Sequence, residues 1–250
     1  MASKGLLLGT VFNAPLSISF NGVDEDLFNN TPQTIGIAND WSVQALCEPA
    51  ALTASEMVVF TIRGAPNEIV LSILAFDPND PLRVWTRNSS GTTIKRYEFE
   101  NHFTVGVKVS ILCTWDGTDL VTYIDGSVAT PTTLVDDNAG TMTDTARRVS
   151  ISSREGEGVP QSFFEGKIHS VSVWNTVLTQ PKVTVLENSG RPQEIDNRVN
   201  SGAYDASANL VHYWRLGLDA SDIGKDSGTG TAIDIGDDAV NITSDDIVIY

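Results

Sequence analysis

The chain of 250 residues is long enough to bury a hydrophobic core without a structural metal or a set of disulfides. Its 32 acidic and 16 basic residues give a formal net charge of −16. That balance argues against nucleic acid and against a bare anionic membrane surface, because both attract clustered lysine and arginine. No run approaches the roughly 18 apolar residues of a membrane span, so we expect no membrane insertion.

All-β sandwiches of this length commonly form one domain. We therefore expect a single domain over residues 1–250, with residues 1–15 as an N-terminal arm. The arm carries Lys4 and a short apolar run, which Asn13 and Pro15 interrupt. Pro15 directly follows Ala14, the one small residue suited to cleavage, so we expect no secretory signal peptide.

The chain has two cysteines, Cys47 and Cys113, each inside a run typical of a strand. Two cysteines are too few for a disulfide framework. We expect buried free thiols, and one bridge stays open as an alternative if the two strands are adjacent.

Short apolar runs bounded by turn residues recur along the chain, and their pattern predicts strands. They lie at residues 16–20, 41–47, 57–63, 69–76, 82–86, 105–115, 120–124, 148–152, 166–174, 210–216 and 246–250. In the run 105–115, apolar residues alternate with others, which indicates a strand with one face in a core. Asp116-Gly117 and Asp125-Gly126 follow two of the runs and predict tight hairpin turns. So many short strands favour an all-β sandwich or barrel over alternating β and α units.

One late segment predicts a short helix near residues 180–188. Thr179 is a suitable N-cap, Val183 and Leu186 share one helix face, and Gly190 is a C-terminal stop. We find no internal repeat and no low-complexity tract.

Several segments together resemble one family. They are Phe20–Asp26, Trp41–Leu46, Val109–Val128, Phe164–Asn175 and Asn209–Gly217. In this order they resemble the concanavalin A-like lectin and glucanase superfamily, with its laminin-G and pentraxin domains, in the form found in bacteriophage structural proteins. The resemblance spans roughly residues 16–250 and implies an antiparallel jelly-roll β-sandwich.

Tryptophans are candidates both for the core and for sugar binding. We assign Trp41, Trp115, Trp174 and Trp214 to the core, because each lies in a predicted strand. Trp85 lies between Arg83 and Arg87, and we expect it to be exposed and to bind carbohydrate.

Catalytic residues are scarce. Glu98 and Glu100 would share one face of a strand, as the carboxylates of glycan hydrolases with this fold do. The resemblance implies a third carboxylate where this chain has Asn101 and His102. The three histidines are scattered, without the spacing of a zinc site or of a nucleophilic triad. We expect no enzyme, and keep hydrolysis by Glu98 and Glu100 as the alternative.

Calcium is the one metal that the sequence favours, since relatives of this fold often bind it at the rim of the sandwich. Asp24 and Asp26, after the Asn21-Gly22 turn, are the first candidate ligands, and Asp136 with Asp137 comes next. Solvated surface charge is the alternative for each pair.

The resemblance to bacteriophage proteins implies a virion structural protein: a capsid decoration, fibre or tail-associated module, assembled in the host cytoplasm. Its expected partners are other virion proteins and host surface glycans, and we expect a homo-oligomer. A cellular carbohydrate-binding adhesion module is a further alternative.

Overall fold

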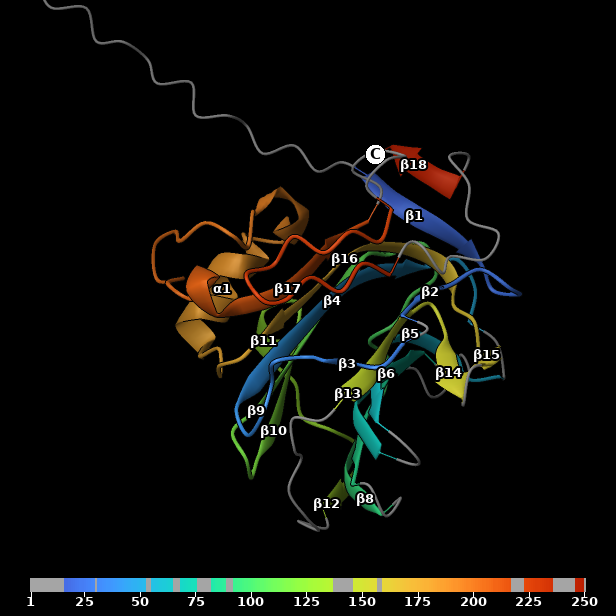
Figure 1. The fold of residues 1–250 in the computed structure, drawn as a ribbon, viewed down its shortest axis with the longest axis horizontal. Helices are drawn as coiled ribbons and strands as arrows, with labels where there is room; N and C mark the ends of the chain where they lie inside the picture. Colours follow the sequence, from blue (N-terminus) through green and yellow to red (C-terminus); the bar gives the residue numbers. More distant parts are fainter. Residues whose placement is uncertain are drawn as a thin grey trace, which may run out of the picture.

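The computed structural model describes residues 16–29, 31–52, 55–64, 68–75, 82–88, 92–136, 146–156, 159–216, 223–235 and 246–249. Within these ranges the chain is built almost entirely from antiparallel strands, which form two large sheets packed face to face (Figure 1). One α-helix follows late in the chain. The predicted antiparallel β-sandwich with one short helix is confirmed, and no described helix could span a membrane.

The first sheet contains the segments that carry most of the family resemblance. In spatial order its strands are β11 (Ser127–Val128), β10 (Leu120–Ile124), β9 (Val109–Trp115), β4 (Trp41–Pro49), β16 (Glu165–Trp174), β1 (Leu16–Asn21) and β18 (Ile247–Ile249). β17 (Leu210–Arg215) also pairs with β16, further along that strand than β1. The long strands β4 and β16 therefore form the centre of this sheet.

The second sheet consists mainly of a run of consecutive hairpin strands. In spatial order its strands are β12 (Thr133–Asp136), β8 (Thr93–Phe99), β7 (Leu82–Arg87), β6 (Glu68–Ala75), β5 (Met57–Gly64), β13 (Ala146–Ile151) and β2 (Leu27–Phe28). β3 (Gln33–Thr34) also pairs with β13, and β14 (Arg154–Gly156) pairs with β15 (Val159–Gln161) as a small separate ribbon.

The main core lies between the two sheets and is filled by alternate residues of the strands. Trp41 and Trp115 stack there with ring centroids 6.4 Å apart, and Trp214 packs 6.2 Å from Phe60. All four tryptophans assigned to the core are buried, including Trp174. The assignment of these tryptophans to the core is therefore confirmed.

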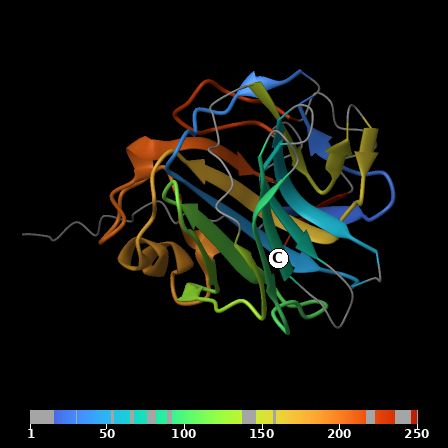
Figure 2. The ribbon, with the colours of Figure 1, turned by 90° about the horizontal axis from the view of Figure 1, so that it is seen from below.

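A second, smaller core lies on the outer face of the first sheet, where helix α1 (Gln180–Glu187) covers it. Val183 and Leu186 of the helix pack with Trp174 of β16 and Leu112 of β9. Figure 2 shows α1 on the side of the first sheet that faces away from β5, β6 and β7. Two short 3-10 helices, Pro192–Glu194 and Ser207–Asn209, follow α1 along the chain.

Two details of the predicted strands are wrong. The strand expected from Val105 begins only at Val109, because the chain turns at Gly106, where φ is +72°, and leaves Val105 and Val107 half exposed. The Asp116-Gly117 turn is a four-residue loop, in which the Asp116 carboxylate accepts the backbone N–H groups of residues 118 and 119. The Asp125-Gly126 turn has positive φ at both residues, as expected.

Both cysteines are free and buried. Although they lie on the adjacent strands β4 and β9, Cys47 pairs with Val109 and Cys113 pairs with Val43. Four residues of strand therefore separate the thiols, roughly 13 Å, which is too far for a disulfide. Burial raises the pKa of Cys113 to about 12.

Candidate functional site

Trp85 lies on the outer face of the second sheet, the face that points away from the first sheet. Its neighbours in β7, Leu82 and Val84, fill the main core, so Arg83, Trp85 and Arg87 point outward. The same alternation turns arginines of β5, β8 and β13 outward. We call these residues the arginine–tryptophan face: Arg63, Arg83, Trp85, Arg87, Arg96 and Arg148.

Strand register aligns three of these arginines. Arg148 of β13 is opposite Arg63 of β5, Arg63 is opposite Ile69 of β6, and Ile69 is opposite Arg87 of β7. Arg87 in turn is opposite Thr93. The row crosses five strands, and Arg63 and Arg87 lie two strand spacings apart, roughly 10 Å.

A second row, parallel to the first, is lined with hydroxyl groups. Ser150, Thr61 and Ser72 follow one another across β13, β5 and β6, and Ser72 is opposite Trp85, which is opposite Arg96. The small side chains are buried, whereas Trp85 is partly exposed. Among the described residues the Ser72 hydroxyl has no hydrogen-bond partner.

Trp85 is held in place by two contacts. Its indole N–H donates to the Thr93 hydroxyl over 3.1 Å, and the Arg87 guanidinium carbon lies 5.0 Å from the ring centroid. The cation over the ring is attracted by its π-electrons. The structure therefore places Trp85 as an oriented, partly exposed aromatic ring beside positive charge, which is more buried than the sequence suggested.

Glu98 lies at the end of this face and is engaged by arginines. An Arg83 nitrogen lies 2.8 Å from Glu98 Oε1, and Arg96 Nε lies 3.6 Å from the same oxygen. Glu100 lies beyond the end of β8, in a turn, so the two carboxylates do not share a strand face. Glu98 is also not at an edge, because β12 pairs with β8. This arrangement gives no support to a pair of hydrolytic carboxylates.

The two aspartates expected to bind calcium lie in different surroundings. Asp24 is exposed on the turn after β1, where its carboxylate accepts a hydrogen bond from the Asn21 amide over 2.9 Å. Asp26 is buried, and it accepts the Ser153 hydroxyl over 2.6 Å. No group of three metal-ligating side chains occurs within the described ranges. The calcium site stays a prediction.

The second calcium candidate, Asp136, forms an ion pair with Lys95, whose side chain is fully buried inside the sandwich. Lys95 points inward because it alternates along β8 with Tyr97 and Phe99, which fill the main core. Asp137, the other aspartate of this candidate calcium pair, lies outside the described residues.

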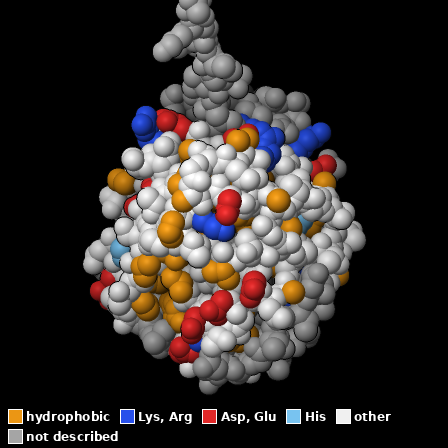
Figure 3. Space-filling model, turned by 90° about the vertical axis from the view of Figure 1, so that its left-hand side faces the viewer, with side chains coloured by type: hydrophobic (Ala, Val, Ile, Leu, Met, Phe, Trp, Pro, Cys, Tyr) orange, Lys and Arg blue, Asp and Glu red, His pale blue; other side chains and the backbone are white. Residues whose placement is uncertain are grey.

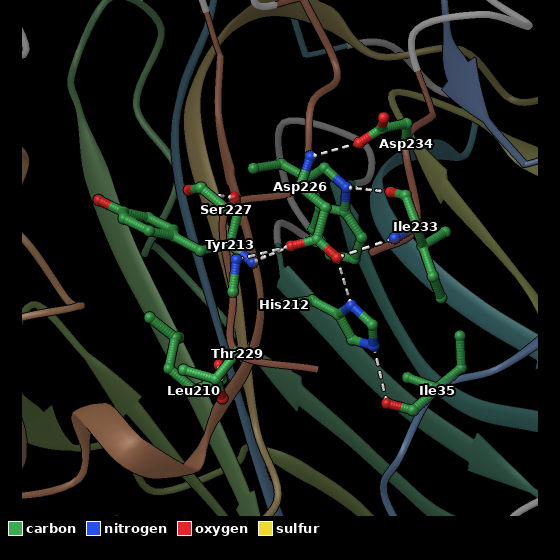
Figure 4. Close-up of polar contacts among 11 residues, drawn as sticks. Ile35, Leu210, His212, Tyr213, Asp226, Ser227, Thr229, Ile233 and Asp234 are labelled. Carbon is green, nitrogen blue, oxygen red and sulfur yellow. Dashed lines mark hydrogen bonds and ion pairs between the residues drawn. The ribbon is translucent and has the colours of Figure 1, made fainter. Parts of the chain in front are cut away.

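A buried His–Asp pair fastens the segment 223–235 to β17 (Figure 4). Asp226 accepts from His212 Nδ1 over 2.6 Å and from the backbone N–H groups of Tyr213 and Ile233. His212 Nε2 lies 2.7 Å from the Ile35 carbonyl oxygen, which can only accept. Burial raises the pKa of Asp226, but the hydrogen bonds from His212 and the backbone outweigh it and hold the pKa below its ordinary value.

The Asp226 carboxylate and the Ile35 carbonyl oxygen thus engage both ring nitrogens of His212. A cleft of about 450 Å³ adjoins it, lined by residues that include Gln33, Thr34 and Thr231. Both polar ends of His212 are already satisfied, so we assign the pair a structural role.

A second cleft, of about 520 Å³, lies where α1 ends against the β10–β11 turn. Burial raises the pKa of Glu187 there to about 7, and the Asp125 carboxylate adds to the shift. On the face that carries α1, basic side chains are scattered and hydrophobic ones gather along one side (Figure 3). This face therefore lacks the aligned arginines of the second sheet.

The sequence made Trp85 a candidate for carbohydrate binding, which stays a prediction, and it showed no sign of the arginine row. Arg83, Trp85 and Arg87 alternate visibly within one strand. Arg63 and Arg148 come from strands far apart in the chain, and they join the row only through the registers of β5, β6 and β13. The sequence pattern contains no signal for those registers.

Comparison with known proteins supports the fold. The native heptameric SAP-like pentraxin of Limulus polyphemus is 13% identical, with a TM-score of 0.58 over 95% of each chain. The CBM40 of Ruminococcus gnavus IT-sialidase, bound to α2,3-sialyllactose, is 10% identical, with a TM-score of 0.52 over 68% of this chain and 97% of its own. No curated protein matches the sequence. The family model of the concanavalin A-like lectin/glucanases superfamily matches residues 24–184, and the chain belongs to that superfamily.

Proposed function

We propose that this domain binds carbohydrate on the arginine–tryptophan face and does not cleave it. The observation that carries the proposal is the partly exposed, oriented Trp85 indole on an outward sheet face. Aromatic rings of this kind pack against the apolar faces of sugar rings, while neighbouring polar groups bind the hydroxyls.

The fold supports the proposal, since it is shared with a carbohydrate-binding module bound to sialyllactose. The absence of cleavage is supported by the state of Glu98, which two arginines engage, and by Glu100, which lies outside β8. Hydrolysis would need two carboxylates that flank one glycosidic bond.

The test is glycan binding by isothermal titration calorimetry, with a panel of neutral and acidic oligosaccharides and polysaccharides. We expect Trp85→Ala to weaken binding by roughly 10- to 100-fold, about 1.4–2.7 kcal/mol, because it removes the stacking surface. Trp85→Phe keeps an aromatic ring and should retain most of the affinity.

Two results would contradict this proposal. One is wild-type protein that binds no member of the panel. The other is Trp85→Ala with unchanged affinity and a normal near-ultraviolet circular dichroism spectrum, which would place the sugar elsewhere. Product analysis after long incubation with the same polysaccharides tests for cleavage, and we expect none.

We also propose that the domain acts on a virus particle, as a decoration, fibre or tail-associated protein that attaches to host surface glycans. Support comes from the resemblance of residues such as Asn209–Gly217 to bacteriophage structural proteins. Mass spectrometry of purified virions tests this role, and absence of the protein from particles would refute it without affecting the binding proposal.

A further inference from the structure

The cleft at the end of α1 lies on the outer face of the first sheet, opposite the arginine–tryptophan face (Figure 2). Its volume of about 520 Å³ is in the range of small-molecule sites. Its lining combines the carboxylates of Asp125 and Glu187, the ammonium of Lys108, and the hydroxyls of Ser110 and Ser189. Several titratable groups in one cleft of this size mark a candidate binding site.

Two elements bring the carboxylates together. Glu187 is the last residue of α1, and Asp125 begins the tight turn between β10 and β11. A Cβ atom at Gly126 would lie 2.8 Å from Glu187 Cγ, so the turn approaches the helix closely because glycine stands there. The Gln180 side-chain amide at the other end of α1 donates to the Gly126 carbonyl oxygen over 2.7 Å. Helix and turn are therefore held against each other.

Ser110 of β9 orients both carboxylates. Its backbone N–H donates to Asp125 Oδ1 over 2.9 Å. Its hydroxyl accepts from the Gln44 side-chain amide over 3.1 Å and hydrogen-bonds to the Glu187 carboxylate. One residue of the sheet thus contacts both acids, which places them side by side at one wall of the cleft.

The cleft has one negative charge more than it has positive charges when its groups are all ionised. Lys108 is its one basic lining residue, against two carboxylates. Among the described residues, neither Asp125 nor Glu187 forms an ion pair, and Lys108 forms none either. Burial and the Asp125 charge raise the pKa of Glu187 to about 7. In the free protein, a proton therefore supplies the missing positive charge.

The end of the helix adds to the negative potential. The carbonyl groups at a helix C-terminus carry partial negative charge, which basic side chains commonly offset. The last turn of α1 contains no basic residue and ends on the acidic Glu187. Two carboxylates and a helix C-terminus therefore converge on a place where a cation would be stabilised.

We propose that this cleft binds a ligand with a primary ammonium group, held by Asp125 and Glu187 at the C-terminal end of α1. An ammonium has three N–H donors and no acceptor, which suits carboxylate and carbonyl oxygens. Lys108 and Ser189 can donate to oxygen atoms elsewhere on the same ligand, such as the hydroxyls of an amino sugar. The site is separate from the arginine–tryptophan face and does not depend on carbohydrate binding there.

Binding of an ammonium should depend on pH, because it favours the ionised form of Glu187. Affinity should therefore rise as the pH increases from about 6 to about 8, with release of a proton. The charged groups that act on Glu187, directly or through one neighbour, are Asp125, Lys108, Glu48 and Glu194. Burial lowers the pKa of the nearby His169 to about 3, so this ring stays uncharged over that range.

The experiment uses isothermal titration calorimetry with the intact chain and two matched pairs of probes. The pairs are 5-aminopentanol with 1,5-pentanediol and glucosamine with glucose, which differ in an amine and a hydroxyl. We expect the amine to bind about tenfold more tightly or better in at least one pair, a preference that added salt reduces. The first pair reports a simple amine, and the second reports an amino sugar.

Asp125→Asn and Glu187→Gln each remove a charge and nearly keep the shape of the side chain. Each should weaken binding of the amine by about tenfold. Glu187→Gln should also remove the pH dependence for 5-aminopentanol, whose amine stays protonated between pH 6 and pH 8. Glu100→Gln is the matched control, because Glu100 is an exposed carboxylate outside the cleft, and it should bind as the wild type does. Thermal unfolding verifies that each variant is folded.

Three results would overturn the inference. The first is equal affinity, or none, for both members of each pair. The second is a preference for amines that neither Asp125→Asn nor Glu187→Gln reduces, since the ammonium would then bind elsewhere. The third is a preference that Trp85→Ala abolishes, which would move the ligand to the arginine–tryptophan face. The first two results would leave the carbohydrate-binding proposal intact, and a preference retained in Trp85→Ala supports a separate site.

Discussion

The two outer faces of the sandwich have opposite characters. The outer face of the first sheet is closed by α1 and its neighbours, and Trp174 is fully buried there with its indole N–H donating to the Tyr204 hydroxyl over 2.9 Å. On the outer face of the second sheet, Trp85 is partly exposed and surrounded by arginines. Tryptophan is thus part of a core on one face and partly exposed to solvent on the other. The difference lies in what covers each ring.

Truncation of the two tryptophans should separate these roles most strongly. Trp174→Ala removes a fully buried ring and leaves Tyr204 without a donor, so we expect a loss of about 3–5 kcal/mol in the free energy of unfolding. Trp85→Ala should cost about 1 kcal/mol and should instead abolish most glycan affinity. Urea denaturation measures both. Similar losses of stability would mean that Trp85 is a core residue.

The closed face also depends on the His212–Asp226 pair, since β17 supplies Leu210 and Tyr213 to its small core. Asp226→Asn replaces a buried carboxylate that contacts His212 and two backbone N–H groups, and it should cost about 3 kcal/mol at pH 7. Glu194→Gln, which breaks an exposed ion pair, is the control and should change stability by less than about 0.5 kcal/mol.

The pH dependence of that pair has a definite sign. The pKa of Asp226 is lowered in the folded state, so its contribution is present above the unfolded pKa of about 4 and is lost as the pH falls through the folded value. Urea midpoints between pH 7 and pH 2 should therefore fall less steeply in Asp226→Asn than in the wild type. Parallel curves would contradict this assignment.

Glu187 should change the pH dependence of stability in the opposite direction and by a smaller amount. Its pKa is raised to about 7, so the folded state favours the protonated acid, and stability falls as the pH rises from about 4.5 to about 7. Because Glu187 is only half-buried, solvent screening limits the effect to about 1 kcal/mol. Glu187→Gln should be more stable than the wild type at pH 8 and equal to it at pH 4, as measured by urea denaturation.

Calcium should produce the smallest change. If Asp24 and Asp26 bind the ion, calcium at a concentration equal to its Kd stabilises the fold by about 0.4 kcal/mol. Thermal unfolding with calcium and with chelator measures this shift, and Asp24→Asn should remove it. If a chelator abolished glycan affinity, calcium would be needed for glycan binding. The candidate calcium site at Asp24 and Asp26 and the arginine–tryptophan face would then not act independently.

Much of the fold could be predicted from local pattern, and the reason is physical. Alternation predicted β9 and β16, and the Asp125-Gly126 pair predicted its tight turn, because both depend on neighbouring residues alone. Helix α1 was recognisable from Thr179 in the same way, although the Thr179 side chain makes no capping hydrogen bond and the left-handed C-cap is Asn188, not the expected Gly190.

The site depended on contacts that no local pattern contains. The extra residue Ile94 in β8 places Thr93 opposite Arg87, and a register shift between Ile62 and Arg63 brings Arg63 into the arginine row. His212 and Asp226 are 14 residues apart, and no pattern in the sequence links them. Bulges and long-range pairs of this kind are decided by packing.

The two buried thiols allow opening of the hydrophobic core to be measured. Burial raises the pKa of Cys113 to about 12 and raises that of Cys47 well above its ordinary value, so both stay protonated at neutral pH. Alkylating reagents attack the thiolate, and no solvent reaches either sulfur in the folded chain. Cys47 and Cys113 can therefore be alkylated only when the sandwich opens. The rate of alkylation measures how often the sandwich opens.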